Sequence, residues 1–209
     1  NRAGAAPFAF GTNYVTAGGD TVNFATFKYY VSNFVLVKDD GSEYVVPQAG
    51  TYHLVDAAVT GSNSITLADI PAGKYTGIKY IIGVDSLRST TDVSQRTGDL
   101  DPAGAGADMY WSWNSGYIFY KIEGTSPQST EVNNVFMYHI GGYGGYSSPM
   151  TNNIRNVSIT SAEALEVGEG HSPEAHIYAD VLQAFTSPVN YNIASGAVIH
   201  MPAMGAVMA

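Results

Sequence analysis

Short runs that alternate apolar and polar residues recur along the chain, and turn-forming residues separate them. Asp40-Gly41 lies between the runs at 34–38 and 44–46, which is the pattern of a β-hairpin. A Pro-Ala-Gly turn at 71–73 separates two further runs in the same way. We expect roughly nine or ten short strands joined by antiparallel turns.

This pattern places the chain in the all-β class. We predict an antiparallel β-sandwich of Greek-key type with long loops, although a closed barrel fits the same pattern. Helices are expected to be short at most, since Val181–Phe185 offers only a turn or two. The last expected strands begin at Ile154 and Ala175. No repeat or linker stands out, so residues 1–209 are predicted to form a single sandwich domain.

The run MYWSWNSGYIFYK, from Met109 to Lys121, contains both tryptophans of the chain. Side chains alternate between the faces of a strand, so Trp111 and Trp113 share a face if this run is one continuous strand. They would then fill the core or form a stacking surface for sugar rings. The Asn-Ser-Gly at 114–116 interrupts the run and favours an edge, a bulge or the rim of a pocket.

Composition narrows the classes of function. The chain has no Cys, so disulfides and thiolate metal sites are excluded. The formal net charge of −9 disfavours nucleic acid as a partner. Charged residues make up only 13% of the chain, and this low fraction, with abundant Tyr and Gly, is typical of secreted β-proteins. No apolar run is long enough for a membrane span.

Five histidines remain as candidate metal ligands, and no HxH or HExxH pattern links them. Neutral imidazole suits Cu, Zn, Ni or Fe, whereas thioether sulfur selects Cu(I). His139 stands at the end of an expected strand, just before glycines. The C-terminal HMPAMGAVM offers His200, Met201, Met204 and Met208, but Met near an apolar C-terminus is usually packing.

A polar, Gly-rich segment at 89–108 is expected to be a long loop. Loops of this length in a compact domain are usually functional or locally structured. Asp99, Asp101 and Asp108 in this loop could hold Ca²⁺, although the Glu that completes an EF-hand loop is missing.

Enzyme motifs are missing from the chain. It has no GxSxG, no P-loop and no dinucleotide fingerprint after a strand. The glycines at 142–145 form a turn pattern and not a phosphate cradle, because no helix is expected after them. We therefore expect a protein that is not an enzyme.

Five stretches give the chain a resemblance to a known family. They are NRAGAAPF at 1–8, FKYYVSNFVLV at 27–37, YHLVD at 52–56, IPAGKYTGIKYIIGVDS at 70–86, and DPAGAGADMYWSWNSGYIFYKIEG at 101–124 with YHIGG downstream. In this order they resemble the MbnP-like family, which is named for the periplasmic partner protein of methanobactin gene clusters. The stretch that contains both tryptophans is the most specific of the five.

The resemblance implies an exported bacterial β-sandwich protein without catalytic turnover, in the periplasm, on the outer surface or secreted. Related proteins bind copper, mainly Cu(I), through histidines and a tryptophan that a dihaem peroxidase-like partner oxidises to kynurenine. Trp111 and Trp113 match the W-x-W of the family, and His139 matches the His of its H-x-G motif. Kynurenine has an aryl amine and a ketone that can donate to copper, whereas the indole nitrogen has no free lone pair.

We therefore expect an exported, extracytoplasmic copper-binding protein. His139 is the first expected ligand, followed by His53 in YHLVD and His176 at the start of an expected strand. Trp111 or Trp113 is the expected site of oxidation.

Two other classes of protein stay open. One is a structural or self-assembling surface protein, in which an open sheet edge takes up a partner and the tryptophans are plain core. The other is a carbohydrate-binding sandwich with exposed aromatic rings on one flat face. Burial of both tryptophans would count against the second class.

Overall fold

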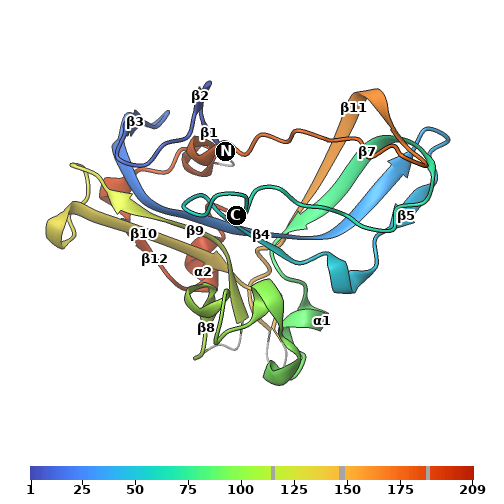
Figure 1. The fold of residues 1–209 in the computed structure, drawn as a ribbon. Coiled ribbons are helices and arrows are strands. Elements are labelled where there is room, and N and C mark those ends of the chain that lie inside the picture. The colour runs from blue at the N-terminus through green and yellow to red at the C-terminus, as the bar shows by residue number, and fades with distance from the viewer. Residues whose placement is uncertain (114–115, 146–148, 187–188) are drawn as a thin grey trace.

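The computed structural model describes residues 1–113, 116–145, 149–186 and 189–209, and Figure 1 shows its fold. A short hairpin of β1 (Arg2–Ala3) and β2 (Ala6–Pro7) opens the chain. The remaining strands are β3 (Asn13–Val15), β4 (Thr21–Lys38), β5 (Glu43–Val45), β6 (His53–Asp56), β7 (Gly73–Ile82), β8 (Tyr110–Trp111), β9 (Gly116–Thr125), β10 (Val135–Gly141), β11 (Arg155–Val167) and β12 (Val198–Ile199). The helical elements are α1 (Ser86–Ser89), α2 (Pro202–Gly205) and the 3₁₀ turns η1 (Gln48–Gly50), η2 (Val93–Gln95), η3 (Gly98–Leu100), η4 (Ala107–Met109), η5 (Val132–Asn134), η6 (Val181–Phe185) and η7 (Ile193–Ser195).

The 18-residue strand β4 is the centre of the main sheet because it pairs along both of its edges. Tyr29, for example, pairs with Val55 of β6 and with Tyr120 of β9. β9 and β7 follow one another along one edge, while β3, β6 and β5 follow one another along the other. The sheet therefore has the order β11-β7-β4-β9-β10-β12, and in Figure 1 β9 and β10 lie in one wing and β7 and β11 in the other.

The all-β prediction is confirmed, and the arrangement agrees with the sandwich class. The 34–46 hairpin forms as expected, with Leu36 opposite Tyr44 and Gly41 at a φ of 82° in the turn. Positive φ is a conformation that glycine adopts without a steric penalty. One expectation is corrected, because β10 and β12 pair in parallel while the other strand pairs described are antiparallel.

Two expected strands are wrong. The run before the Pro-Ala-Gly turn is irregular, and its Ile65 and Leu67 instead pack as a cover on the core around Phe34. The strand expected from Ala175 does not form, and η6 follows it as a single helical stretch. Asp180 explains why η6 begins at Val181, since its side chain accepts the backbone N–H of Leu182 and caps the helical turn.

In the described residues, three apolar clusters pack on the sheet, and one of them is the core around Phe34 already mentioned. The largest packs β-strand residues such as Phe24, Phe136 and Tyr138 against Phe185 and Met208. A second cluster, on residues of β4, β8 and β9, lies under the 84–111 segment. That segment is folded into short helical turns, which confirms the expected local structure in the long loop. In the parts of the chain described, no helix is long and apolar enough to cross a membrane.

Candidate functional site

The two tryptophans lie in a hairpin and not in one continuous strand, which corrects the sequence prediction. β8 pairs antiparallel with β9, placing Tyr110 opposite Tyr117 and Trp111 opposite Gly116. The chain turns directly after Trp111, so strand alternation does not continue to Trp113. Trp111 is 6% exposed and Trp113 is 59% exposed. The strand breaks at Ser112 and Trp113, just before the expected interruption at 114–116, of which residues 114 and 115 lie outside the described residues.

Trp111 packs on the backbone at the end of β10. A Cβ added at Gly141 would lie 2.8 Å from Cζ3 of Trp111 and would also clash with the carbonyl oxygen of Tyr117. Only glycine therefore lets the indole approach this strand so closely. Trp113 contacts Trp111 with ring centroids 5.4 Å apart. The tryptophan pair thus borders the strand that carries His139.

A row of polar side chains crosses one face of the sheet. Register aligns His139 of β10 with Lys121 of β9, and Lys121 with Lys28 of β4. Lys28 pairs in turn with Asp56 of β6. In the 3₁₀ turn η4, Asp108 reaches this row from above. We call the set the polar row, and it consists of His139, Glu123, Lys121, Lys28, Asp56 and Asp108.

Ion pairs make the polar row continuous. Lys28 Nζ lies 2.9 Å from Oδ2 of Asp56 and 3.2 Å from Oδ2 of Asp108. Lys121 Nζ lies 3.2 Å from the same oxygen of Asp108 and 3.6 Å from Oε1 of Glu123. Burial alone would raise the pKa of Asp108, but the two ammonium groups outweigh it and lower that pKa. Asp108 therefore clamps the η4 turn onto the sheet.

Glu123 joins His139 to the polar row. His139 Nε2 lies 2.7 Å from Oε1 of Glu123, and Thr26 Oγ1 donates to Oε2 at 2.8 Å. The hydrogen bond from His139 is the main cause that lowers the pKa of Glu123 to about 2, with Thr26 and Lys121 adding to it. An ionised carboxylate only accepts hydrogen bonds, so His139 Nε2 carries the proton. In the neutral ring, the lone pair is then on Nδ1.

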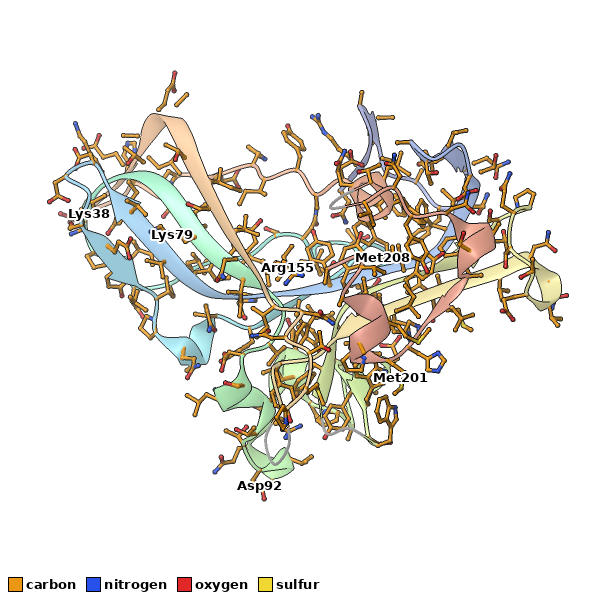
Figure 2. All side chains as sticks on the ribbon, turned by 180° about the vertical axis from the view of Figure 1, so that it is seen from behind. Lys38, Lys79, Asp92, Arg155, Met201 and Met208 are labelled. Atoms are coloured by element: carbon orange, nitrogen blue, oxygen red, sulfur yellow. The ribbon has the colours of Figure 1, made fainter. Side chains whose placement is uncertain are left out.

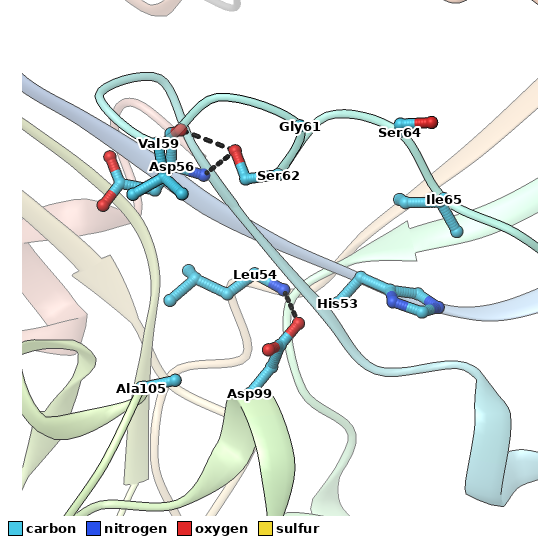
Figure 3. A pocket seen from close by; sticks show the side chains of 10 residues that line it. All are labelled: His53, Leu54, Asp56, Val59, Gly61, Ser62, Ser64, Ile65, Asp99 and Ala105. Carbon is cyan, nitrogen blue, oxygen red and sulfur yellow. Dashed lines mark hydrogen bonds between the residues drawn. The ribbon is translucent and has the colours of Figure 1, made fainter.

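His53 lies elsewhere on the sheet. Its Nε2 is 3.2 Å from the carbonyl oxygen of Gly50, and its ring is 6.1 Å from that of Phe34. It lines an open cavity of about 420 Å³ together with Asp56 and Asp99. Figure 3 shows the imidazole directed away from the carboxylate of Asp99, which instead accepts the backbone N–H of Leu54 at 2.8 Å.

The three predicted histidines do not come together. β4 and β9 separate β6 from β10, so three strand spacings, about 14 Å, lie between His53 and His139. His176 lies in irregular chain with its side chain 78% exposed, and its Nε2 is 3.9 Å from Glu174. Within residues 1–113, 116–145, 149–186 and 189–209, no group of three or more His, Cys, Asp or Glu side chains could hold a metal ion.

The three aspartates of the long loop have separate partners. Asp99 accepts from the backbone of β6, Asp101 Oδ1 accepts the N–H of Ala103 at 2.8 Å, and Asp108 belongs to the polar row. Their carboxylates are thus used to fold the loop and to fasten it to the sheet. The calcium prediction gains no support from this geometry.

Sequence reasoning missed the polar row. A local signal was present, since Lys121 and Glu123 are oppositely charged and two residues apart on an otherwise apolar strand. Such residues share a strand face. Their partners on β4, β6 and β10 come from distant segments, however, and only the register of the sheet identifies them.

The fold and the site define an all-β sandwich protein with a histidine–carboxylate row and a tryptophan hairpin at the end of the same strands. The chain belongs to the MbnP family, whose profile matches residues 1–201. This confirms the resemblance seen in the motifs. The family is not a known enzyme family.

One solved structure supports the same fold. MbnP from Methylosinus trichosporium is similar with a TM-score of 0.54 and 19% sequence identity, over 77% of this chain and 69% of that chain. At this identity the similarity concerns the fold. No curated protein sequence matches the chain.

Proposed function

We propose that this protein is an extracytoplasmic copper-binding member of the MbnP family and that His139 is a ligand. The observation that carries the proposal is the hydrogen bond from Nε2 of His139 to Glu123. Histidines that bind metals usually donate their second ring N–H to a carboxylate, which fixes the tautomer and the orientation of the ring. His139 has this arrangement, with the lone pair on Nδ1 as the donor for copper.

The structure is compatible with copper at His139, but His53, His139 and His176 do not form one three-histidine centre. β4 and β9 separate His53 from His139, and the three histidines form no common group among the described residues, so the proposal does not place them in one coordination sphere. Imidazole is a common ligand of copper, and Cu(I) is satisfied by few, soft donors. When bound, copper would supply a redox-active or transferable ion, while the chain positions the ligands and does no chemistry of its own.

Trp113 is the better candidate for oxidation to kynurenine. A separate oxidising protein must reach or approach its target, and Trp113 is 59% exposed, whereas Trp111 is 6% exposed. The contact between the two rings would let Trp111 take part as a relay of electrons. Both tryptophans lie in the tryptic peptide 97–121, so fragmentation of this peptide in the mass spectrometer tests the assignment. Kynurenine adds two oxygens and loses a carbonyl relative to tryptophan, and the fragment masses place this change at one of the two residues. Oxidation confined to Trp111 would contradict it.

Copper binding is tested by competition with a Cu(I) chelator of known affinity. His139→Ala should weaken binding by at least about tenfold, and Glu123→Gln should weaken it less, because it removes only the partner of the ligand. His176→Ala is the matched control, since that side chain is 78% exposed and lies in irregular chain outside the sheet. A wild-type protein that binds no copper, or a His139→Ala variant with unchanged affinity, overturns the proposal.

The geometry favours self-assembly less than copper binding. β11 ends the sheet, with β7 as its strand partner, and so presents the kind of edge that a second chain could extend. It also carries Glu163 and Glu166 and a register shift between Thr160 and Leu165. Charges and bulges on an edge strand discourage further pairing.

A further inference from the structure

The C-terminal segment runs directly beside β10. By the C-terminal segment we mean residues 197–209. Its strand β12 pairs in parallel with β10, with Met137 opposite Val198 and Tyr138 opposite Ile199. A few residues on, a Cβ added at Gly142 would lie 2.9 Å from Cβ of Pro202. The segment therefore accompanies β10 from residue 137 to residue 142.

Asn153 fixes this arrangement from the side. Its buried Nδ2 donates to the carbonyl oxygen of Gly141 at 2.8 Å and to that of Pro202 at 2.7 Å. Gly205 of α2 also lies against Ile140, where an added Cβ would be 3.2 Å from Cγ2. The C-terminal segment is thus fastened to the end of β10 by both polar and apolar contacts.

His200 follows Ile199 as His139 follows Tyr138, so continuing the register by one position beyond the end of β12 sets the two histidines side by side. Neighbouring strands lie about 4.8 Å apart, and paired residues of parallel strands point to the same face. Burial follows this alternation, because Tyr138 and Ile199 are fully buried, whereas Met137 and His200 are exposed and His139 is partly exposed. Met137, His139 and His200 therefore share the outer face of the β10–β12 pair.

Methionines also gather around this place, and they differ in exposure. Met208 is 7% exposed and packs in the large core, which agrees with the expected packing role. Met201 and Met204, at the start of α2 and within it, are 44% and 45% exposed. Figure 2 shows Met201 at the periphery and Met208 among packed side chains. Exposed apolar side chains are informative where they gather in one place, as Met201 and Met204 do here, rather than where they occur singly.

We propose that Met137, His139 and His200 form a soft-metal site selective for Cu(I), with Met201 as an adjacent second thioether. The inference rests on the proposed function and adds the further ligands Met137, His200 and Met201. Met137 and His139 are two residues apart on a strand, so both donors project from one face. A set of thioether and imidazole donors selects Cu(I) over harder divalent ions.

The test compares Cu(I) with Zn(II) on the same variants of the full chain. Met137→Leu keeps the volume and apolar character of the side chain and removes only the sulfur. We expect it, and His200→Gln, to weaken Cu(I) binding by at least about tenfold in chelator competition, while Met137→Leu changes Zn(II) affinity by less than about threefold. Met204→Leu is the matched control, because Met204 is also exposed (45%, against 36% for Met137) but lies in α2 and is not one of the proposed ligands.

X-ray absorption at the copper edge gives an independent result. The wild-type protein loaded with one Cu(I) should show a copper–sulfur shell, and Met137→Leu should reduce or remove it. Circular dichroism confirms that each variant is folded. Wild-type protein that binds no Cu(I) would refute the proposed function itself. Cu(I) binding that depends on His139 but not on Met137 or His200, without a copper–sulfur shell, would refute this inference and leave the proposed function standing.

Discussion

Replacement of Glu123 by Gln tests whether the polar row stabilises the fold through charge. Gln keeps the length of the side chain and can still bond to His139 and Thr26, so the change removes mainly the negative charge. The pKa of Glu123 falls from 4.5 to about 2 in the fold. At about 1.4 kcal/mol for each pKa unit, this corresponds to about 3 kcal/mol of stability. The Glu123 side chain is 26% exposed, so screening by water lowers our expectation to about 2 kcal/mol.

The sign of the pH dependence follows from the lowered pKa. Above about pH 5 the carboxylate is ionised in both the folded and the unfolded chain, and its contribution is fully present. As the pH falls from about 4.5 to about 2, the unfolded chain takes up the proton first, and the contribution is lost. The difference in unfolding free energy between wild type and Glu123→Gln should therefore shrink to less than about half by pH 3.

Urea unfolding followed by fluorescence at several pH values measures this difference. Glu43→Gln is the control, because Glu43 pairs with Lys79 at 2.6 Å but both side chains are about half exposed, and such pairs contribute less than about 1 kcal/mol. A Glu123→Gln variant as stable as wild type at pH 7 would refute the reasoning. A deficit that stays constant from pH 7 to pH 3 would show that shape, and not charge, is responsible.

Three further results follow from the packing around β10. Gly141→Ala should lower the unfolding free energy by about 1–3 kcal/mol in urea titrations, because its Cβ would meet Trp111, whereas Gly50→Ala should be nearly neutral, since nothing lies within 4 Å. Asn153→Ala should cost about 2–3 kcal/mol in the same titrations, because two backbone carbonyls lose their buried donor. Trp113→Phe should remove most iodide-quenchable fluorescence, and Trp111→Phe should leave it, in line with exposures of 59% and 6%.

Local patterns predicted the strands well and their partners poorly. The hairpin around Gly41 depends on two adjacent turn residues and on the runs beside them, so it could be recognised from the sequence. The parallel pairing of Tyr138 with Ile199 joins segments about sixty residues apart, and no local pattern encodes it. Ala175 begins a run with strand-like composition that stays irregular, because the capped turn at Asp180 and the core around Phe185 set the path of the chain there.

For the candidate site too, single residues could be predicted from local motifs, whereas their partners on other strands could not. His139 could be singled out from its motif, but the ligand role that we propose for it depends on its bond to Glu123, which only the pairing of β9 with β10 brings within reach. The HMPAMGAVM stretch looked like ordinary packing, and Met208 is indeed packed. The role that we propose for His200 and Met201 depends on the parallel pairing of β12 with β10, because both residues follow directly after β12.

The tryptophan hairpin brings Trp111 into contact with Gly141 at the end of β10. A turn after Trp111 buries one indole and leaves the next exposed, so a single W-x-W supplies both a core residue and a surface residue. Gly141 makes the burial of Trp111 possible, since any side chain at this position would displace the indole from β10. β10 therefore carries two residues with different contacts. His139 belongs to the polar row, and Gly141 leaves room for the ring of Trp111. Replacing either residue should perturb the end of β10. A change at His139 removes its hydrogen bond to Glu123, whereas a change at Gly141 disturbs the packing of Trp111.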